Sequence, residues 1–161
     1  MVRKRKIRTV QEEAIKVILS VPNANTIEGI RDLSILSLLY DSAIRVQELI
    51  DLKIGDVTLI KPSVIRVNGK GNKQRLVPID PASAKIVSLY MNKYGLINKE
   101  QFLFTNRSKN QLTRVGITYI LNKYVSAVKQ TNPDLIPISV TPHILRHSKS
   151  THLLSAGVNL I

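Results

Sequence analysis

An amphipathic pattern with a helical period is the most regular feature of the sequence. It follows Thr113, a residue type that caps helix N-termini, and predicts a long helix there. A second helical pattern begins at Val10, with Thr9–Glu12 as an expected capping box, and stops at Pro22. Residues 27–40 become almost wholly apolar toward their end, which predicts a buried helix. The apolar positions of the long helix are Ile117, Ile120, Leu121, Tyr124, Val125 and Val128.

Local start and stop signals predict three more helices. Asp80-Pro81 supplies an N-cap followed by Pro at the first helical position, and Gly95 marks the expected end. Thr141-Pro142 repeats this device and predicts a last helix that runs to about Ala156. A short helix is predicted from about residue 45 to residue 52.

Two short β-prone runs, 64–68 and 74–79, flank the segment Gly69-Lys-Gly-Asn72. This arrangement predicts an antiparallel hairpin with a slightly long loop. Residues 102–104 are expected to form either a third strand or an extended linker. The expected fold class is therefore α+β, mostly α-helical with a small antiparallel β-sheet.

The charge is strongly positive and unevenly placed. The 24 Lys and Arg residues against 11 Asp and Glu give a net charge of +13, and the excess lies almost wholly in residues 66–161. Such asymmetry favours a polyanionic partner, most often nucleic acid, although a basic surface selected for solubility gives the same count. With only 4% aromatic residues and no Trp, binding to duplex DNA is favoured over a stacking platform for single strands.

The composition also excludes several classes of protein. The chain has no Cys, which rules out disulfides, thiolate zinc sites and cysteine nucleophiles. No apolar run is long enough for a membrane span and no signal peptide follows the basic start, so a cytoplasmic protein without a membrane partner is expected. One domain of residues 9–161 is expected, after a basic linker remnant at residues 1–8.

Three groups of residues are candidates for chemistry. Arg45 stands at a predicted helix start, where a guanidinium and the helix dipole would together attract an anion; the alternative is a surface ion pair with Glu48 or Asp41. The hairpin tip around Lys70 is either a phosphate cradle or an ordinary basic turn. It is not a Walker A loop, because its glycine spacing differs and no Ser or Thr follows the Lys.

The third group is Thr141-Pro-His143-Ile-Leu-Arg146-His147. His143 and Arg146 are three positions apart in the first turns of a helix, which suits them to hold a phosphate together. His143 and His147 also have the four-residue spacing of zinc-binding helices, but no Glu follows His143 and an Arg separates the pair. A metal site is therefore not expected. The alternative is a capped helix with partly buried histidines.

Together the three groups resemble the catalytic domain of the tyrosine recombinases, the phage integrase family. The resemblance covers residues 10–161, and its motifs occur in the family's order and spacing. They are Tyr40-Asp-Ser-Ala-Ile-Arg45-Val-Gln-Glu-Leu, Gly69-Lys-Gly-Asn-Lys73 with Arg75-Leu-Val-Pro78, the Thr141–His147 group, and Ser150-Thr-His-Leu-Leu-Ser-Ala-Gly157.

The resemblance implies a role for each matching residue. Arg45 and Arg146 would clamp the scissile phosphate, Lys70 would protonate the leaving 5′ oxygen, and His143 would bond the phosphate and help to manage the proton of the nucleophile. It implies duplex DNA and further recombinase protomers as partners, and DNA integration or recombination of a mobile element without cofactor or metal. The further DNA contacts that we expect are Lys73, Arg75, Arg114 and His147.

The sequence departs from the family at the nucleophile. All five tyrosines precede His143, whereas the family's Tyr and a second His or Trp follow it. We therefore expect a truncated catalytic domain that is inactive alone. The alternatives are a type IB topoisomerase, a non-catalytic duplex-binding module on the same fold and, more distantly, an RNA-binding helical domain.

Overall fold

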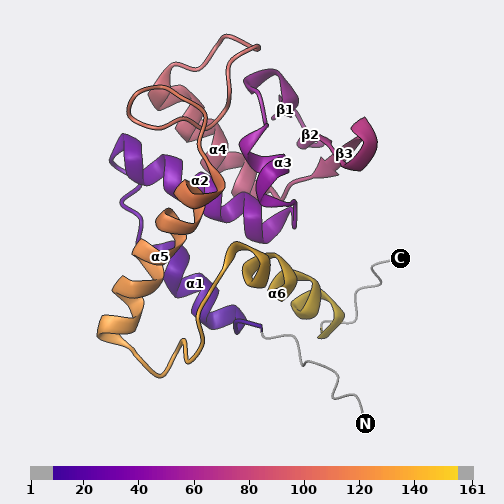
Figure 1. The fold of residues 1–161 in the computed structure, drawn as a ribbon. Coiled ribbons are helices and arrows are strands. Elements are labelled where there is room, and N and C mark those ends of the chain that lie inside the picture. Colours follow the sequence, from indigo (N-terminus) through magenta and orange to yellow (C-terminus); the bar gives the residue numbers. More distant parts are fainter. Residues whose placement is uncertain (1–8, 156–161) are drawn as a thin grey trace.

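The computed structural model describes residues 9–155, with side chains to residue 149. Six α-helices and one three-stranded sheet make up this part of the chain (Figure 1). The predicted fold class is thus confirmed. The helices are α1 (Glu12–Ser20), α2 (Ile27–Asp41), α3 (Val46–Ile50), α4 (Pro81–Tyr94), α5 (Arg114–Thr131) and α6 (Pro142–Ser155). The strands are β1 (Val57–Thr58), β2 (Val64–Asn68) and β3 (Gln74–Pro78), and one-turn 3-10 helices cover Ile54–Asp56 and Lys70–Asn72.

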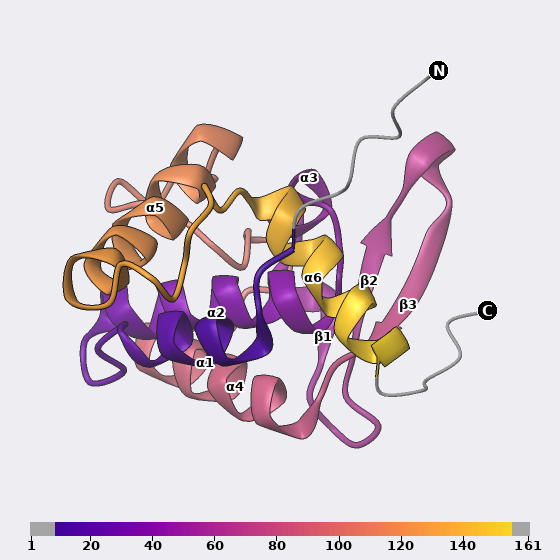
Figure 2. The same ribbon diagram turned by 90° about the horizontal axis from the view of Figure 1, so that it is seen from below.

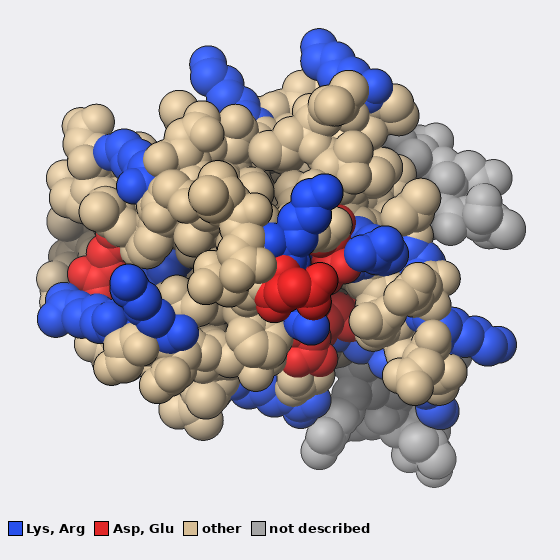
Figure 3. Space-filling view, turned by 90° about the horizontal axis from the view of Figure 1, so that it is seen from above, with Lys and Arg blue, Asp and Glu red and all other residues tan. Residues whose placement is uncertain are grey.

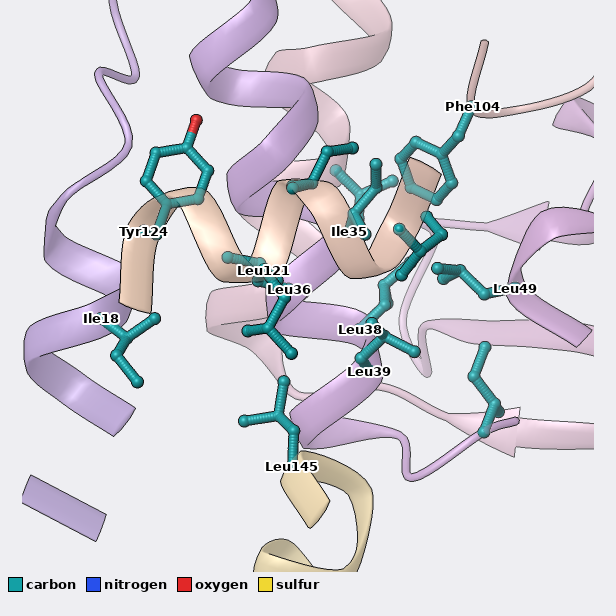
Figure 4. Close-up of a cluster of buried hydrophobic side chains, with 14 of the residues drawn as sticks. Ile18, Ile35, Leu36, Leu38, Leu39, Leu49, Phe104, Leu121, Tyr124 and Leu145 are labelled. Carbon is teal, nitrogen blue, oxygen red and sulfur yellow. The ribbon is translucent and has the colours of Figure 1, made fainter. Parts of the chain in front are cut away.

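Helix α2 is the central element of the fold. It packs against α1, α3, α4 and α6, and ten of its residues are buried. Leucine and isoleucine side chains from α2 meet Phe104 and side chains of α1, α3, α5 and α6 in one cluster (Figure 4). The apolar end of residues 27–40 is largely buried because α1, α3, α4 and α6 pack around this helix. The six apolar positions predicted for α5 are all buried as well.

The sheet stands at one side of the helices, and its hairpin projects from the body (Figure 2). Strand β2 lies between β1 and β3 and is antiparallel to both, with Val67 opposite Arg75 and Asn68 opposite Gln74. The predicted hairpin is therefore confirmed. Helix α6 crosses α2 near the sheet, so that its first turn approaches the start of α3 (Figure 2).

Several helix ends follow the local signals. Thr113 Oγ1 accepts the N–H of Gly116, Thr141 Oγ1 accepts the N–H of Ile144, and Gly95 ends α4 with φ of +60°. One prediction was wrong. Thr9 forms no capping box, because α1 starts only at Glu12 and its N-cap is Gln11. Of the two alternatives for residues 102–104, the structure has the linker, with one bridge to Lys53, and the third strand is the two-residue β1.

No helix in the described range is long and apolar enough to span a membrane. No group of His, Asp and Glu side chains there is arranged to hold a metal ion. The predicted linker, residues 1–8, and the end of the predicted last helix at Ala156 lie outside the described residues.

Candidate active site

A cleft of about 920 Å³ opens where four elements meet. Its wall is formed by the start of α3, the hairpin turn between β2 and β3, the first turns of α5, and the start of α6. Arg45, Lys70, Arg114 and His143 all line it. A smaller pocket of about 300 Å³ adjoins the cleft, shares Arg45 and His143 with it, and adds Arg146. The structure thus gathers all four residues expected to be catalytic, from three distant parts of the chain.

Arg45 is the N-cap residue of α3, and its side chain is exposed to the cleft. Its backbone N–H donates to Oε1 of Glu48 at 2.9 Å, which closes the first turn of this short helix. The guanidinium that pairs with Glu48 is that of Arg75, and the cation beside Asp41 is Lys149. The surface ion pairs considered for Arg45 are therefore formed by other residues in this structure.

Lys70 begins the tight turn of residues 70–72 at the hairpin tip and is exposed. The tip is closed by a hydrogen bond from the N–H of Gly69 to the carbonyl of Lys73 at 2.8 Å. Gly71 and Asn72 both have positive φ, of 73° and 58°, which lets the chain reverse within this turn. The turn thereby carries an exposed ammonium group to the edge of the cleft.

His143 and Arg146 lie in the first turns of α6, as their spacing predicted. Pro142 occupies the first helical position, and His143 is exposed at the cleft. Nε of Arg146 donates to the carbonyl oxygen of Ala43, in the turn that connects α2 to α3. Ala43 has φ of 53°, a left-handed conformation that is unusual for a residue with a Cβ. This turn therefore links the two arginines, since Arg45 follows Ala43 by two residues.

The four further residues expected to contact DNA differ in their position relative to the cleft. Arg114 lines the cleft, and its Nε donates to Oε1 of Gln47 at 3.0 Å. Lys73 is exposed on the hairpin but does not line the cleft. His147 is half-buried on α6, also outside the cleft lining. The guanidinium of Arg75 donates two hydrogen bonds to the carboxylate oxygens of Glu48, from Nη1 at 2.5 Å and from Nη2 at 3.1 Å.

Burial alone would raise the pKa of Glu48. The hydrogen bonds from the Arg75 side chain and from the Arg45 N–H outweigh it and hold this pKa below its usual range. Glu48 is therefore ionised at neutral pH although its side chain is only 7% exposed. It was considered above only as a partner for the Arg45 guanidinium; its spacing of three residues from an N-cap was the available sign of a role in capping.

Gln47, Asp51 and Gln111 were not predicted as site residues, yet all line the cleft. The two glutamine side chains both donate to Oδ1 of Asp51 at 2.9 Å. This chain of bonds ties the loop before α5 to α3 and positions Arg114. The four-residue spacing of Gln47 and Asp51 is a local helical signal, whereas Gln111 reaches Asp51 only through the tertiary fold and no sequence signal marks it.

The cleft is rich in positive charge. Among the residues that line it are Arg45, Lys53, Lys70 and Arg114, against Glu48 and Asp51, which bond to other side chains. On the face seen from above, acidic side chains form a few small groups beside Lys and Arg, and other basic side chains stand out at the rim (Figure 3). Guanidinium, ammonium and imidazole groups around one space can bind a phosphate and stabilise charge that develops on it.

Comparison with known proteins identifies relatives along almost the whole chain. The profile of the phage integrase family matches residues 8–161. The tyrosine recombinase XerC of Staphylococcus haemolyticus is 34% identical over 151 residues, which cover 92% of this chain and 48% of that protein. XerD of the same organism is 38% identical, with 92% and 49% covered. The chain thus spans about half the length of the curated relatives it matches.

Solved structures share the fold. The crystal structure of XerA recombinase superposes with a TM-score of 0.81 at 25% identity, covering 99% of this chain and 54% of that one. The site-specific recombinase XerH, bound to its difH substrate in a pre-cleavage complex, gives a TM-score of 0.76 at 21% identity, covering 96% and 46%.

Proposed function

Because this chain belongs to the phage integrase family, we propose that its cleft binds a phosphodiester of duplex DNA and forms the catalytic site of a site-specific tyrosine recombinase. One observation carries the proposal. Arg45, Lys70 and His143 come from three distant segments and line one cleft, and Arg146 lies in the pocket that adjoins it. The reaction is cleavage and rejoining of DNA strands through a 3′-phosphotyrosyl bond.

Each residue has a part in that reaction. Arg45 and Arg146 hold the non-bridging oxygens of the phosphate and neutralise the charge of the pentavalent transition state. A tyrosine oxygen forms the new bond to phosphorus while the bond to the 5′ oxygen breaks. Lys70 gives its proton to that leaving oxygen, and His143 bonds the phosphate and takes part in the transfer of the tyrosine proton. No metal or cofactor enters this scheme.

We propose that the nucleophile is none of the five tyrosines present, because all of them precede His143. The hydroxyls of Tyr90 and Tyr124 donate to Leu103 O and to Asp32, and burial raises both pKa values far above the ordinary range. Tyr40 lies under the ammonium of Lys149, with a pKa raised by burial to about 12. In the family the nucleophilic tyrosine lies C-terminal to the helix that carries the His-x-x-Arg motif, and residues 147–161 of this sequence contain no tyrosine.

Duplex DNA is the proposed partner, with other recombinase protomers in a synaptic complex. Arg114 at the cleft and Lys73 on the hairpin are proposed to contact the backbone on either side of the scissile phosphate. His147 adds a contact from α6. We propose that the recombined DNA belongs to a mobile genetic element. The proposed compartment is the cytoplasm.

The test uses the chain extended by a segment that carries the nucleophilic tyrosine. A suicide substrate should trap a covalent adduct with the extended chain and none with residues 1–161 alone. Lys70→Ala should cleave an ordinary substrate about 10²- to 10⁴-fold more slowly, because an alkoxide leaves poorly without a positioned acid. A substrate with a 5′-bridging sulfur should restore its rate, since a thiolate leaves without a proton.

Lys73→Ala is the matched control, three residues along the same hairpin. It should show no rescue by sulfur. Equal rescue of both variants, or of neither, would remove Lys70 from the role of general acid. An extended chain that binds duplex DNA but forms no adduct would point instead to a non-catalytic binding module.

A further inference from the structure

Arg75 occupies the junction between the hairpin and α3. Its Nη1 and Nη2 donate to the two carboxylate oxygens of Glu48, at 2.5 Å and 3.1 Å. Oε1 of Glu48 also accepts the backbone N–H of Arg45 at 2.9 Å. One buried carboxylate therefore joins strand β3 to the residue at which α3 begins.

Gly69 is fitted closely around this bond. A Cβ at Gly69 would lie 3.0 Å from Nη1 of Arg75 and 3.7 Å from Oε2 of Glu48. The backbone of Gly69, with φ of −89°, is one that any residue adopts. A side chain at this position would therefore require the guanidinium of Arg75 to shift by a few tenths of an ångström. Since Lys70 is the next residue, the Arg75–Glu48 pair lies against the residue at which the Lys70 turn begins.

We propose that Arg75 is a positioning residue that fixes the Lys70 turn relative to Arg45 through Glu48, in place of the direct DNA contact expected from the sequence. The inference rests on the function proposed above. In that function Lys70, as the acid, and Arg45, as part of the phosphate clamp, must contact the same phosphate, so the Arg75–Glu48 pair would keep them at a fixed distance. A two-point bond between planar groups sets both distance and orientation, which a single ammonium contact does not.

The neighbouring strand offers a matched pair. Arg66 on β2 donates from Nε and Nη2 to Oδ1 of Asp56, at 3.1 Å and 3.0 Å, and its side chain is 49% exposed against 47% for Arg75. Asp56 bonds the backbone of Lys53 and not a residue at the start of α3. Arg66 thus shares the charge, exposure and sheet of Arg75 without its link to Arg45.

The first experiment compares Arg75→Lys with Arg66→Lys in the tyrosine-extended chain. Lysine keeps the charge but loses the fork, so Arg75→Lys should cleave an ordinary substrate about 10²-fold more slowly, the scale of a misplaced catalytic group. The 5′-bridging sulfur substrate should restore most of this loss, which a general loss of folded protein would not allow. Arg66→Lys should cleave both substrates as the parent does. Wild-type cleavage by Arg75→Lys would overturn the inference.

The second experiment uses residues 1–161 and needs no cleavage. In Arg75→Ala, amide exchange at Gly69 and Arg45 should be about tenfold faster or more, while Arg66→Ala leaves both unchanged. The slope of log affinity for duplex DNA against log salt should stay as in the parent. Unchanged exchange with a slope reduced by about one would make Arg75 a phosphate contact. If Lys70→Ala is not rescued by sulfur, the acid role fails, and this exchange readout still decides whether Arg75 holds the turn.

Discussion

At the scale of single residues, the contacts of Arg146 favour arginine over lysine in the proposed phosphate clamp. Its Nε is committed to the carbonyl of Ala43, which orients the guanidinium and leaves its Nη groups for a ligand. The ammonium of a lysine is a single nitrogen and cannot hold the Ala43 carbonyl and two phosphate oxygens in fixed directions. Arg146 is thus attached to the turn that leads into Arg45.

We therefore expect Arg45→Lys and Arg146→Lys each to lower cleavage by about 10²-fold or more in a tyrosine-extended chain, as for other preorganised donors to a developing oxyanion. Single-turnover rates on a suicide substrate measure this. The melting temperature serves as the control and should change little for Arg45→Lys, because that side chain is exposed. Cleavage by Arg146→Lys at the parent rate would remove Arg146 from the phosphate clamp.

At the scale of elements, the sequence predicted what local chemistry determines. Thr113 and Thr141 cap their helices by bonds within one turn, and Gly95 supplies the left-handed residue that ends α4. The hairpin followed from two β-prone runs around a glycine-containing turn. The candidate residues Arg45, Lys70, His143 and Arg146 could be chosen on their motifs, since these motifs are also local.

What the sequence did not predict depends on partners far along the chain. β1 has only two residues, and it exists because Val57 lies opposite Ile65. Thr9 has the right spacing for a capping box with Glu12, but α1 begins only beyond Thr9. The pairing of Arg75 with Glu48 spans 27 residues and was not predicted, because an exposed arginine in a basic hairpin looks the same whether it binds DNA or a carboxylate.

Three elements meet at a second charged cluster, whose centre is Asp41 at the end of α2. Oδ2 of Asp41 accepts the N–H of Asp80, the N-cap of α4, at 2.9 Å. Lys149 of α6 lies 3.7 Å from Asp41 and 3.9 Å from Asp80, over the ring of Tyr40. Burial and the neighbouring carboxyl group of Asp80 raise the pKa of Asp41 to about 6, against the opposing effects of the Asp80 N–H and of Lys149.

This raised pKa makes a prediction about stability. The folded state holds the Asp41 proton more tightly than the unfolded state does, which stabilises the fold at low pH. This contribution to the free energy of unfolding is fully present below the unfolded pKa, about 4, and is lost as the pH rises through about 6. Asp41→Asn keeps an acceptor for Asp80 but does not titrate. As the pH rises from about 4 to about 7, the free energy of unfolding of the variant should therefore increase by about 1–3 kcal/mol relative to that of the parent, as measured by urea unfolding. Asp134→Asn, in an exposed loop, is the control; a parallel pH profile for Asp41→Asn would contradict the prediction.

At the scale of the whole molecule, several acidic side chains form ion pairs with basic side chains of the same chain. Glu48, Asp56 and Asp32 are bonded to Arg75, Arg66 and Arg31, and Asp41 lies beside Lys149. Residues 66–161 contribute few acids of their own, so the cleft and hairpin keep their excess of Lys and Arg. A surface of this kind attracts DNA phosphates without reading the bases.

Residues 1–161 should therefore bind duplex DNA weakly, with little sequence preference and a steep dependence on salt. Each phosphate neutralised releases condensed counterions, which lowers log affinity by about 0.9 per contact for each unit of log salt. Arg114→Ala, at the cleft, should reduce the magnitude of that slope by about one. Arg107→Ala removes the same charge from a side chain that is 87% exposed and lines a different pocket, with Glu28, so the slope should not change. Titrations of labelled duplex over a series of salt concentrations measure both slopes. An affinity insensitive to salt would contradict the proposed DNA surface, and equal slopes for the two variants would contradict the placement of DNA in the cleft.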